Sequence, residues 1–359
     1  MKISIIGNSL PAIILAKKLS EKKLNIDIYY QKNLDLRDST RTIGITEENI
    51  NYLIKSFPEI YKHAFPIKSI CIYDEKNLKK EILKFQSEKT NQFYVIKSSN
   101  IKRVTQNIIK KNKSIKYLKR NLKYIYTQNF LKKNDLVIDT YLEDKIIKKY
   151  FFKKIKKNYF SKAYTTIIKH KNIVNHQAIQ IFTKSGPLAF LPISNTETSI
   201  VFSSKKNNIQ PEELKNLVSK YNKKYKIMKF GQIDTSDLMM SIFKNYFHKN
   251  IMAFGDKIHK VHPLAGQGFN MCIRDVRQLI NIFNERIECG LPLNYEIAQN
   301  FEHKVKAKNL IFANSLDFIL EFFYLENKLP ASITNKFFEI LQNSRIIKDF
   351  SSRIANKGL

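Results

Sequence analysis

The sequence predicts an α/β fold in which a parallel-sheet unit is combined with an antiparallel sheet and a helical C-terminal segment. Residues 3–30 have the order strand, glycine turn, helix, strand, which is typical of a dinucleotide-binding (Rossmann-like) unit. Residues 161–203 change to the two-residue period of strands, and apolar residues recur at helical spacing between 305 and 351. A chain of 359 residues with 43% hydrophobic composition is long enough to bury both cores.

The chain is strongly basic, and its excess positive charge is expected to affect which surfaces the protein binds. The formal net charge is +32, and nearly all of the excess is lysine. Clustered cations attract nucleic acid without sequence preference, but lysine accompanied by abundant Ile, Asn, Tyr and Phe is the profile that A/T-rich codons produce. We therefore expect no nucleic-acid partner and keep a basic nucleic-acid-binding protein as a weaker alternative. The expected consequence is attraction to an anionic membrane surface.

Several classes of protein have no support. No apolar run reaches the roughly 18 residues that cross a bilayer, and the first residues are too brief for a secretory signal, so we expect a cytoplasmic protein. Cys71, Cys272 and Cys289 show no paired spacing and are expected to be reduced. His259 and His262 lie three residues apart, but no further ligands complete a metal site, and we expect none.

The turn after the first strand is the first candidate binding element. A helix over residues 11–22 would start beneath a pyrophosphate, because a helix N-terminus offers free N–H groups. Where three glycines are typical, this chain has Gly7, Ser9 and Ala12, whose small side chains preserve close approach. Gln31 follows the second strand, where an acidic residue usually binds the ribose, and it can still form a hydrogen bond to a sugar.

The segment of residues 251–275 is the most specific. A short strand leads to Gly255 and Asp256, whose carboxylate can accept hydrogen bonds from sugar hydroxyls. A turn rich in Pro and Gly then opens a helix, and Gly266 and Gly268 allow the backbone to approach a ligand. The helix start presents N–H groups and a positive dipole end, which suit an electron-rich ring such as a flavin.

This segment resembles the flavin-dependent aromatic hydroxylases, and among them the ubiquinone-biosynthesis hydroxylases, in which it reads GDxxHxxxPxxGQGxNxxxxD. The chain matches this pattern at Gly255, Asp256, His259, Pro263, Gly266, Gln267, Gly268, Asn270 and Asp275. The alternative is an ordinary strand, turn and helix with capping glycines. The resemblance implies a Rossmann-like FAD domain, an antiparallel-sheet substrate domain and C-terminal helices, with Pro263, Gln267 and Asn270 among the cofactor-binding residues.

Two further positions depend on the resemblance. It places Arg41 near the flavin, whereas an exposed loop arginine is the alternative. The family also has an Asp-Gly pair after a strand, followed by a serine and an arginine, but here residues 136–138 lead to Asp139 and Thr140. Asp139 either keeps a flavin contact or is a neutral loop aspartate. In the family, this segment also helps to engage NAD(P)H. We therefore expect that NAD(P)H reduces the flavin slowly or that the protein depends on another electron donor.

The resemblance also implies a substrate pocket. The family carries a GPLAxLPL-like segment, which this chain matches at Gly186, Pro187, Leu188, Ala189, Leu191 and Pro192. We expect Leu188, Phe190 and Leu191 to form pocket walls facing Pro263 and Leu264. An ordinary hydrophobic strand bounded by prolines is the alternative.

The remaining elements define the predicted domains. We expect helices over 47–57, 100–111, 145–157, 211–225 and 269–289, and strands over 67–73, 83–85 and 227–234. The lysine-rich stretch 145–157 is interpreted as a helix with an apolar face, and a basic binding strip is the alternative. The expected FAD domain comprises residues 1–66, 93–158 and 250–310, the substrate domain 67–92 and 159–249, and the C-terminal helical segment 311–359.

The resemblance implies an FAD-dependent monooxygenase that uses NAD(P)H and O₂ to hydroxylate the aromatic ring of a polyprenylated ubiquinone precursor. Such a protein would be associated peripherally with the inner face of the membrane, with other ubiquinone-biosynthesis proteins as possible partners. No side chain stands out as a catalytic acid or base. The leading alternative is a degenerate, non-catalytic subunit of a biosynthetic complex, which the departures at Ser9, Ala12, Tyr30 and Thr140 favour.

Overall fold

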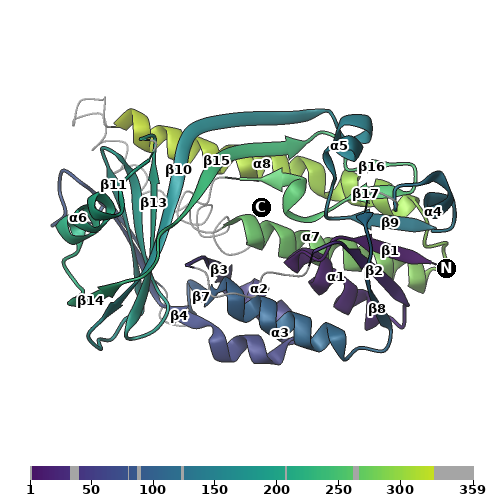
Figure 1. Ribbon diagram of the computed structural model, residues 1–359, viewed down its shortest axis with the longest axis horizontal. Helices are drawn as coiled ribbons and strands as arrows, with labels where there is room; N and C mark the ends of the chain where they lie inside the picture. Colours follow the sequence, from purple (N-terminus) through teal and green to yellow (C-terminus); the bar gives the residue numbers. More distant parts are fainter. Residues whose placement is uncertain are drawn as a thin grey trace.

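The structure is a computed structural model, and it describes residues 2–32, 40–79, 81–86, 90–122, 125–206, 208–261 and 267–326. A six-stranded sheet lies at one end of the molecule and a nine-stranded sheet at the other, with a three-stranded sheet between them (Figure 1). The two long strands β10 (Lys154–His170) and β15 (Asp234–Phe243) and the helix α8 (Glu296–Glu326) run from one end toward the other (Figure 1). The predicted combination of parallel and antiparallel sheets is confirmed.

The six-stranded sheet has the order β16-β17-β9-β1-β2-β8 and is parallel except for the β16–β17 pair. Its strands are β1 (Ile3–Ile6), β2 (Ile26–Tyr30), β8 (Ile115–Lys119), β9 (Leu136–Asp139), β16 (Phe247–His248) and β17 (Ile251–Ala253). All residues of β1, β9 and β17 are buried, as expected for parallel strands covered on both faces.

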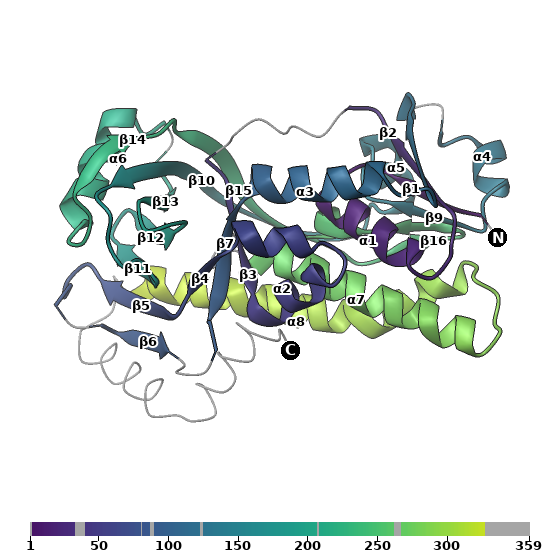
Figure 2. The ribbon, with the colours of Figure 1, turned by 90° about the horizontal axis from the view of Figure 1, so that it is seen from below.

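Helices and the strands of this sheet together form the largest core cluster. The helices are α1 (Leu10–Ser20), α2 (Glu47–Ile54), α3 (Ser98–Lys110) and α7 (Gln267–Glu288). Helix α1 covers one face of the sheet through β1, β2 and β8, whereas α2 contacts α7 and the three-stranded sheet. Figure 2 shows α1 between α3 and α7, both of which it contacts. On the other face, Leu122 and Ile125 pack against Ile6 and Val137. The short helix α4 (Gln128–Lys132) lies between β8 and β9 in the sequence.

The nine-stranded sheet has the order β18-β15-β10-β13-β12-β11-β5-β6, and β14 pairs with β10. Its strands are β5 (Ser69–Asp74), β6 (Leu83–Gln86), β10 (Lys154–His170), β11 (Gln177–Thr183), β12 (Gly186–Pro192), β13 (Glu197–Ser204), β14 (Ile227–Phe230), β15 (Asp234–Phe243) and β18 (His259–Lys260). The helix α6 (Pro211–Tyr221) covers one face through Leu214, Val218 and Tyr221. The three-stranded sheet contains β3 (Thr42–Thr46), β4 (Phe65–Ile67) and β7 (Phe93–Lys97).

Three sequence expectations differ from the structure. The helix expected over 145–157 is only α5 (Asp144–Tyr150), because Lys154 already begins β10. In this strand Ile155 and Tyr159 pack near α8, and Lys157 forms an ion pair with Asp317 of that helix. The strand expected over 67–73 is divided between β4 and β5, which belong to different sheets. The strand expected over 227–234 is interrupted at Gly231, whose N–H donates to the Ile167 carbonyl at 2.8 Å.

The strands that connect the two ends of the molecule cross the domain boundaries expected from the sequence. The expected boundary between residues 158 and 159 falls inside β10. In addition, β18 belongs to the expected FAD domain but pairs with β15. The division into domains stays a prediction, and the two units share strands at this junction.

The C-terminal part described by the structure is one long helix, α8 (Glu296–Glu326), which packs on α7. Residues 327–359 of the expected helical segment lie outside the described residues. Within the described ranges, no helix combines the length and apolar character that crossing a membrane requires.

Candidate functional site

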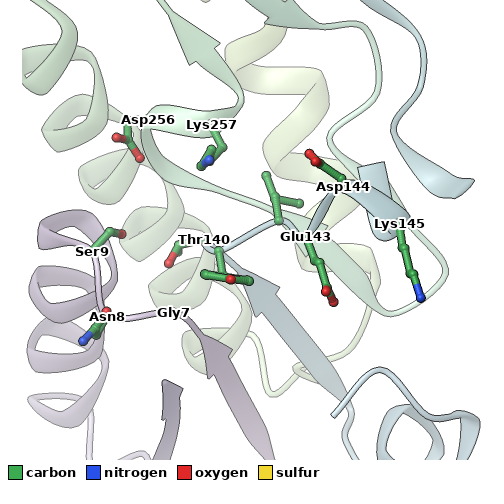
Figure 3. Close-up of a pocket in the computed structure, with 11 residues that line it drawn as sticks. Gly7, Asn8, Ser9, Thr140, Glu143, Asp144, Lys145, Asp256 and Lys257 are labelled. Atoms are coloured by element: carbon green, nitrogen blue, oxygen red, sulfur yellow. The ribbon is translucent and has the colours of Figure 1, made fainter. Parts of the chain in front are cut away.

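A cavity of about 610 Å³ opens at the carboxyl ends of β1, β9 and β17. Its lining comes from the three segments that follow these strands: residues 7–9, residues 140–145, and Asp256 with Lys257 (Figure 3). From β1 the chain order runs to β2 on one side of the sheet and to β9 on the other, so the cavity lies at a topological switch point. Open α/β sheets bind their ligands at such points.

Gly7 allows the first turn to approach the loop after β9. Its φ is +99°, and a Cβ atom there would lie 2.5 Å from Thr140 Oγ1 and 2.9 Å from the Tyr141 amide nitrogen. The Thr140 hydroxyl donates to the Ile6 carbonyl at 3.0 Å, which holds the loop against β1. The glycine predicted from the sequence is therefore required here by conformation and by space.

The start of α1 is only partly available to a ligand. Ser9 is the N-cap, and its Oγ accepts from the Ala12 N–H at 3.4 Å. The Ile13 N–H donates to the Ser9 carbonyl, and Pro11 has no N–H. Ser9 lines the cavity, whereas Ala12 is buried behind it. The first turn thus leaves the Leu10 amide as a donor that can face a bound group.

Asp139 organises a loop of the cavity and does not line it. Its buried Oδ1 accepts from the Tyr141 and Leu142 amides at 3.0 and 2.8 Å, and its Oδ2 accepts from Tyr126 Oη at 2.8 Å. Burial raises the pKa of Asp139 to about 6, although these donors oppose the shift. Burial also raises the pKa of Tyr126, which keeps the phenol protonated as a donor. This partner set favours the loop-aspartate interpretation over a flavin contact.

The raised pKa of Asp139 predicts a pH dependence of stability. The folded protein keeps a proton that the unfolded chain releases near its ordinary pKa of about 4. The contribution from protonated Asp139 is complete below about pH 4 and is lost as the pH rises through about 6. In Asp139→Asn, Oδ1 can keep both amides and the group cannot titrate. We expect the free energy of unfolding of the wild type to fall by about 3 kcal/mol relative to the variant between about pH 4 and pH 7.

Urea unfolding at a series of pH values checks this expectation. Taking the difference between wild type and Asp139→Asn removes the contributions of all other carboxyl groups. Parallel curves for the two proteins would show that Asp139 has the same pKa in the folded and unfolded states.

The segment after β17 completes the cavity. Gly255 has a φ of +81°, and a Cβ there would lie 3.4 Å from Pro11 Cβ, so this turn packs closely on α1. Asp256 is exposed and lines the cavity opposite Ser9 (Figure 3). The exposed carboxylate of Asp256 therefore lies at the cavity, and its hydrogen bonds to a sugar stay a prediction. Within the described residues, a Cβ at Gly268 would make only an ordinary contact of 3.7 Å with Val261.

Asn270 connects α7 to β3 and α2. Its Oδ1 accepts from the Thr46 amide at 3.0 Å and from Asn49 Nδ2 at 2.9 Å, and its Nδ2 donates to the Gly44 carbonyl at 2.9 Å. The amide group is buried and occupied by protein partners. Asn270 positions the start of α7 instead of presenting its side chain to the cavity. Gln267 is buried at the first residue of the same helix.

Two other motif residues form a buried pair. His259 Nε2 donates to Asp275 Oδ2 at 2.5 Å, and Asp275 Oδ1 accepts from Asn309 Nδ2 at 3.1 Å. This pair ties β18 to α7 and α8, so both residues contribute to the architecture of the segment. Within the described part of the chain, no group of His, Cys, Asp and Glu side chains could hold a metal ion.

Several predicted residues lie elsewhere. Arg41 is exposed, directly before β3, and its carbonyl accepts from the Ser98 amide at 2.9 Å. Gln31 follows β2 and is half-buried. Neither side chain lines the cavity. Pro263, Leu264 and Gly266 lie outside the described residues.

The predicted substrate wall stays a prediction, but its three strand residues lie on two different faces of the sheet. Leu188 and Phe190 lie in the core cluster under α6, on the sheet face that α6 covers. Leu191 lies on the opposite face, where it packs against Ile67 and Val95. Successive side chains of a strand point to opposite faces, so one strand segment cannot present all three residues to one pocket.

The sequence interpretation missed most of the second wall of the cavity. Tyr141, Glu143, Asp144 and Lys145 line it, as does Lys257. One signal could have found them: they follow β9 and β17 directly, and residues after the carboxyl ends of parallel strands meet at one edge of the sheet.

The lining fits a flavin dinucleotide. The Gly7 turn leaves no room for a side chain, the cavity lies at the switch point, and the exposed carboxylate of Asp256 can accept hydrogen bonds from sugar hydroxyls. Lys145 and Lys257 add positive charge for phosphate groups.

Comparison with known proteins agrees with this assignment. A family model described as FAD binding domain matches residues 161–288, which contain β12 and the segment from Gly255 to Asp275. The 3-demethoxyubiquinol 3-hydroxylase of Escherichia coli is 28% identical over 161 residues, which are 42% of this chain and 40% of that protein. The mitochondrial ubiquinone biosynthesis monooxygenase COQ6 of Schizosaccharomyces pombe is 24% identical over 228 residues, with 50% and 47% covered. The chain thus spans less than half of these relatives.

Solved structures share the fold over nearly the whole chain. HpxO of Klebsiella pneumoniae, complexed with FAD and uric acid, has a TM-score of 0.69 at 11% identity and covers 99% of this chain and 97% of that one. The p-nitrophenol 4-monooxygenase PnpA of Pseudomonas putida has a TM-score of 0.73 at 10% identity, with 98% and 97% covered. Residues 161–288 thus match the FAD binding domain model, the chain has the fold of solved FAD-dependent monooxygenases, and about half of it is similar in sequence to ubiquinone-biosynthesis hydroxylases.

Proposed function

We propose that this protein is an FAD-dependent monooxygenase that uses NAD(P)H and O₂ to hydroxylate the aromatic ring of a polyprenylated ubiquinone precursor. One observation carries the proposal. The Gly7 turn and the Gly255–Asp256 turn, which are 248 residues apart in the sequence, line one cavity at the switch point of the parallel sheet. Sequence relatives that are named as ubiquinone-biosynthesis hydroxylases support the substrate class.

The residues of the chain would bind and orient the cofactor. The Gly7 turn and the Leu10 amide would contact the pyrophosphate, and Asp256 would accept hydrogen bonds from sugar hydroxyls. When bound, FAD supplies the redox chemistry of the reaction, because protein side chains do not carry out hydride and oxygen chemistry on their own. Asn270 would hold the start of α7 at a defined position relative to β3.

The apolar side of the nine-stranded sheet would exclude water. Leu191 and Ile193 pack with Ile67 and Val95 between this sheet and the three-stranded sheet. A dry environment protects reactive species from water. Leu191 is therefore the member of the predicted pocket that we keep as a substrate-side residue.

Spectroscopy and activity together test the proposal. Protein purified with added FAD should show oxidised-flavin absorbance and a thermal shift, and Asp256→Ala should weaken FAD binding while leaving the apoprotein folded. NAD(P)H-dependent consumption of O₂ with a prenylated phenol, and a hydroxylated product identified by mass spectrometry, would establish the reaction. Absence of both flavin absorbance and thermal shift would refute the cofactor assignment.

A non-catalytic subunit of a biosynthetic complex is the second candidate. The absence of the Asp-Gly, Ser and Arg pattern after Asp139 favours it, as does the reduced set of donors at α1. Anaerobic mixing of the holoprotein with NADPH and then NADH separates the two functions. Rapid bleaching of the flavin supports the enzyme. A flavin that stays oxidised with both reductants supports a subunit role, or a dependence on another donor.

We also propose peripheral association with the inner, anionic face of a membrane. Phe152 and Phe160 are 61% and 76% exposed, and Lys153, Lys154 and Lys156 lie in the same stretch of chain. Lysines near a surface of anionic lipids are attracted to it, and salt screens this attraction. Binding to anionic vesicles should therefore fall at high salt. Equal binding to neutral vesicles at low and high salt would contradict the electrostatic account.

A further inference from the structure

We propose that Lys257 is the cation that binds the diphosphate of FAD in this protein, in place of donors that α1 lacks. The inference rests on the proposed function, because it assumes that FAD occupies the cavity at the carboxyl ends of β1, β9 and β17. It concerns a residue that lies at one of the unspecified positions of the flavin motif.

The first argument is the weakness of the α1 terminus as an anion site. A helix N-terminus binds phosphate through the free N–H groups of its first turn and through its dipole. In α1, Pro11 lacks an N–H and the Ala12 N–H is taken by Ser9 Oγ. The charge of a diphosphate therefore needs compensation from another group.

The second argument is the charge of the cavity lining. Asp256, Glu143 and Asp144 bring three carboxylates, whereas Lys257 and Lys145 are the cations that line it. Without these two lysines, the charged residues of the lining would all be negative, and they would repel a doubly negative diphosphate. Unit charges about 4 Å apart near a protein surface interact by several kcal/mol, so a lining cation decides whether the diphosphate is tolerated.

The position of Lys257 distinguishes it from Lys145. Figure 3 shows Lys257 beside Asp256, across the cavity from Ser9 and Thr140, whereas Lys145 lies at the far side beyond Glu143. Lys257 follows β17 in the short helix η3 (Gly255–Lys257), which packs against α1. None of the ion pairs among the described residues involves Lys257, so its ammonium group is available to a ligand.

The charge of Lys257 also reaches the carboxyl end of β9. Burial raises the pKa of Asp139, and the Lys257 ammonium acts in the opposite direction. Lys257 also lines the cavity together with residues 140–145, which follow β9, so it lies close to the ends of two of the three strands that surround the cavity. A lysine at such a place binds phosphate as a point charge.

The experiment compares flavins with and without phosphate. Binding of FAD and of riboflavin to the apoprotein is measured by flavin fluorescence for the wild type, Lys257→Met and Lys257→Arg. Lys260→Met is the matched control, because Lys260 is exposed three residues further along and does not line the cavity. Thermal unfolding of each apoprotein shows that the fold is retained.

We expect Lys257→Met to weaken FAD binding by about tenfold or more, as for loss of a hydrogen bond to a charged group. Riboflavin binding should stay within about twofold, and Lys257→Arg should retain FAD affinity. The difference for FAD should shrink at about 1 M salt, where the screening length is only about 3 Å.

Two results would overturn the inference while leaving the proposed function intact. One is equal FAD affinity for Lys257→Met and Lys260→Met. The other is an equal loss of FAD and riboflavin binding in Lys257→Met, which would indicate a change of cavity shape and not of charge. If the wild type binds neither flavin, the proposed function itself fails.

Discussion

Gly7→Ala should lower the free energy of unfolding by roughly 2 to 6 kcal/mol and abolish FAD binding. The new Cβ would stand 2.5 Å from Thr140 Oγ1 and 2.9 Å from the backbone nitrogen of Tyr141, so the loop after β9 must move. In addition, the φ of +99° is strained for any L-residue with a side chain. Because this loop lines the cavity, its displacement removes one wall of the site. Urea unfolding and FAD titration measure the two effects.

Gly290→Ala is the matched control for this variant. Gly290 also has a positive φ, of +64°, but no atom lies within 4 Å of a Cβ built there. We therefore expect a cost of only about 1 to 2 kcal/mol from the left-handed conformation, with unchanged FAD binding. Similar losses of stability for Gly7→Ala and Gly290→Ala would show that the close approach of Gly7 to Thr140 is unimportant.

Asp275→Ala should lower the free energy of unfolding by about 3 to 5 kcal/mol, the usual effect of removing one partner from a buried charged or polar pair. The carboxylate is buried and accepts from His259 and Asn309, so both donors would lose their partner. The effect on His259 is the larger one, because its Nδ1 already has no partner among the described residues. Equilibrium unfolding in urea gives the free-energy difference.

Two further variants make the result specific. Asp275→Asn keeps an oxygen that can accept from Asn309 and should lose less stability than Asp275→Ala. Asn281→Ala changes an exposed residue of the same helix and should shift stability by less than about 0.5 kcal/mol. If Asp275→Ala matched Asn281→Ala, the pair between β18 and α7 would not contribute to stability.

Much of the fold follows from local patterns. Strands β1 and β2 and the helix between them have the order expected over residues 3–30, since a short apolar run followed by a glycine turn can be recognised without tertiary context. Helix α7 was also expected, because its apolar residues recur at helical spacing after a glycine-rich turn. The lysine-rich stretch 145–157 was misread at its end, because residues from Lys154 onward belong to β10. Ile155 in this strand packs in a cluster with Ala313 of α8, more than 150 residues further along the chain.

Some residues of the candidate site could likewise be predicted from the sequence, whereas the roles of others depend on the tertiary structure. The sequence alone determined the cofactor class through the family resemblance of residues 255–275, which depends on a local motif. Gly7, Gly255 and Asp256 could be found in this way because each lies in a turn directly after a strand. Only the tertiary structure decided the roles of Asp139 and Asn270. Both side chains are polar and suited to a ligand. The hydrogen bonds of Asn270 are taken by backbone groups of Gly44 and Thr46, which are far away in the sequence, and those of Asp139 are taken by the nearby Tyr141 and Leu142 amides and by Tyr126 Oη. The packing of α6 similarly decided that Leu188 and Phe190 face the core, since a strand by itself does not specify which of its two faces meets the cofactor domain.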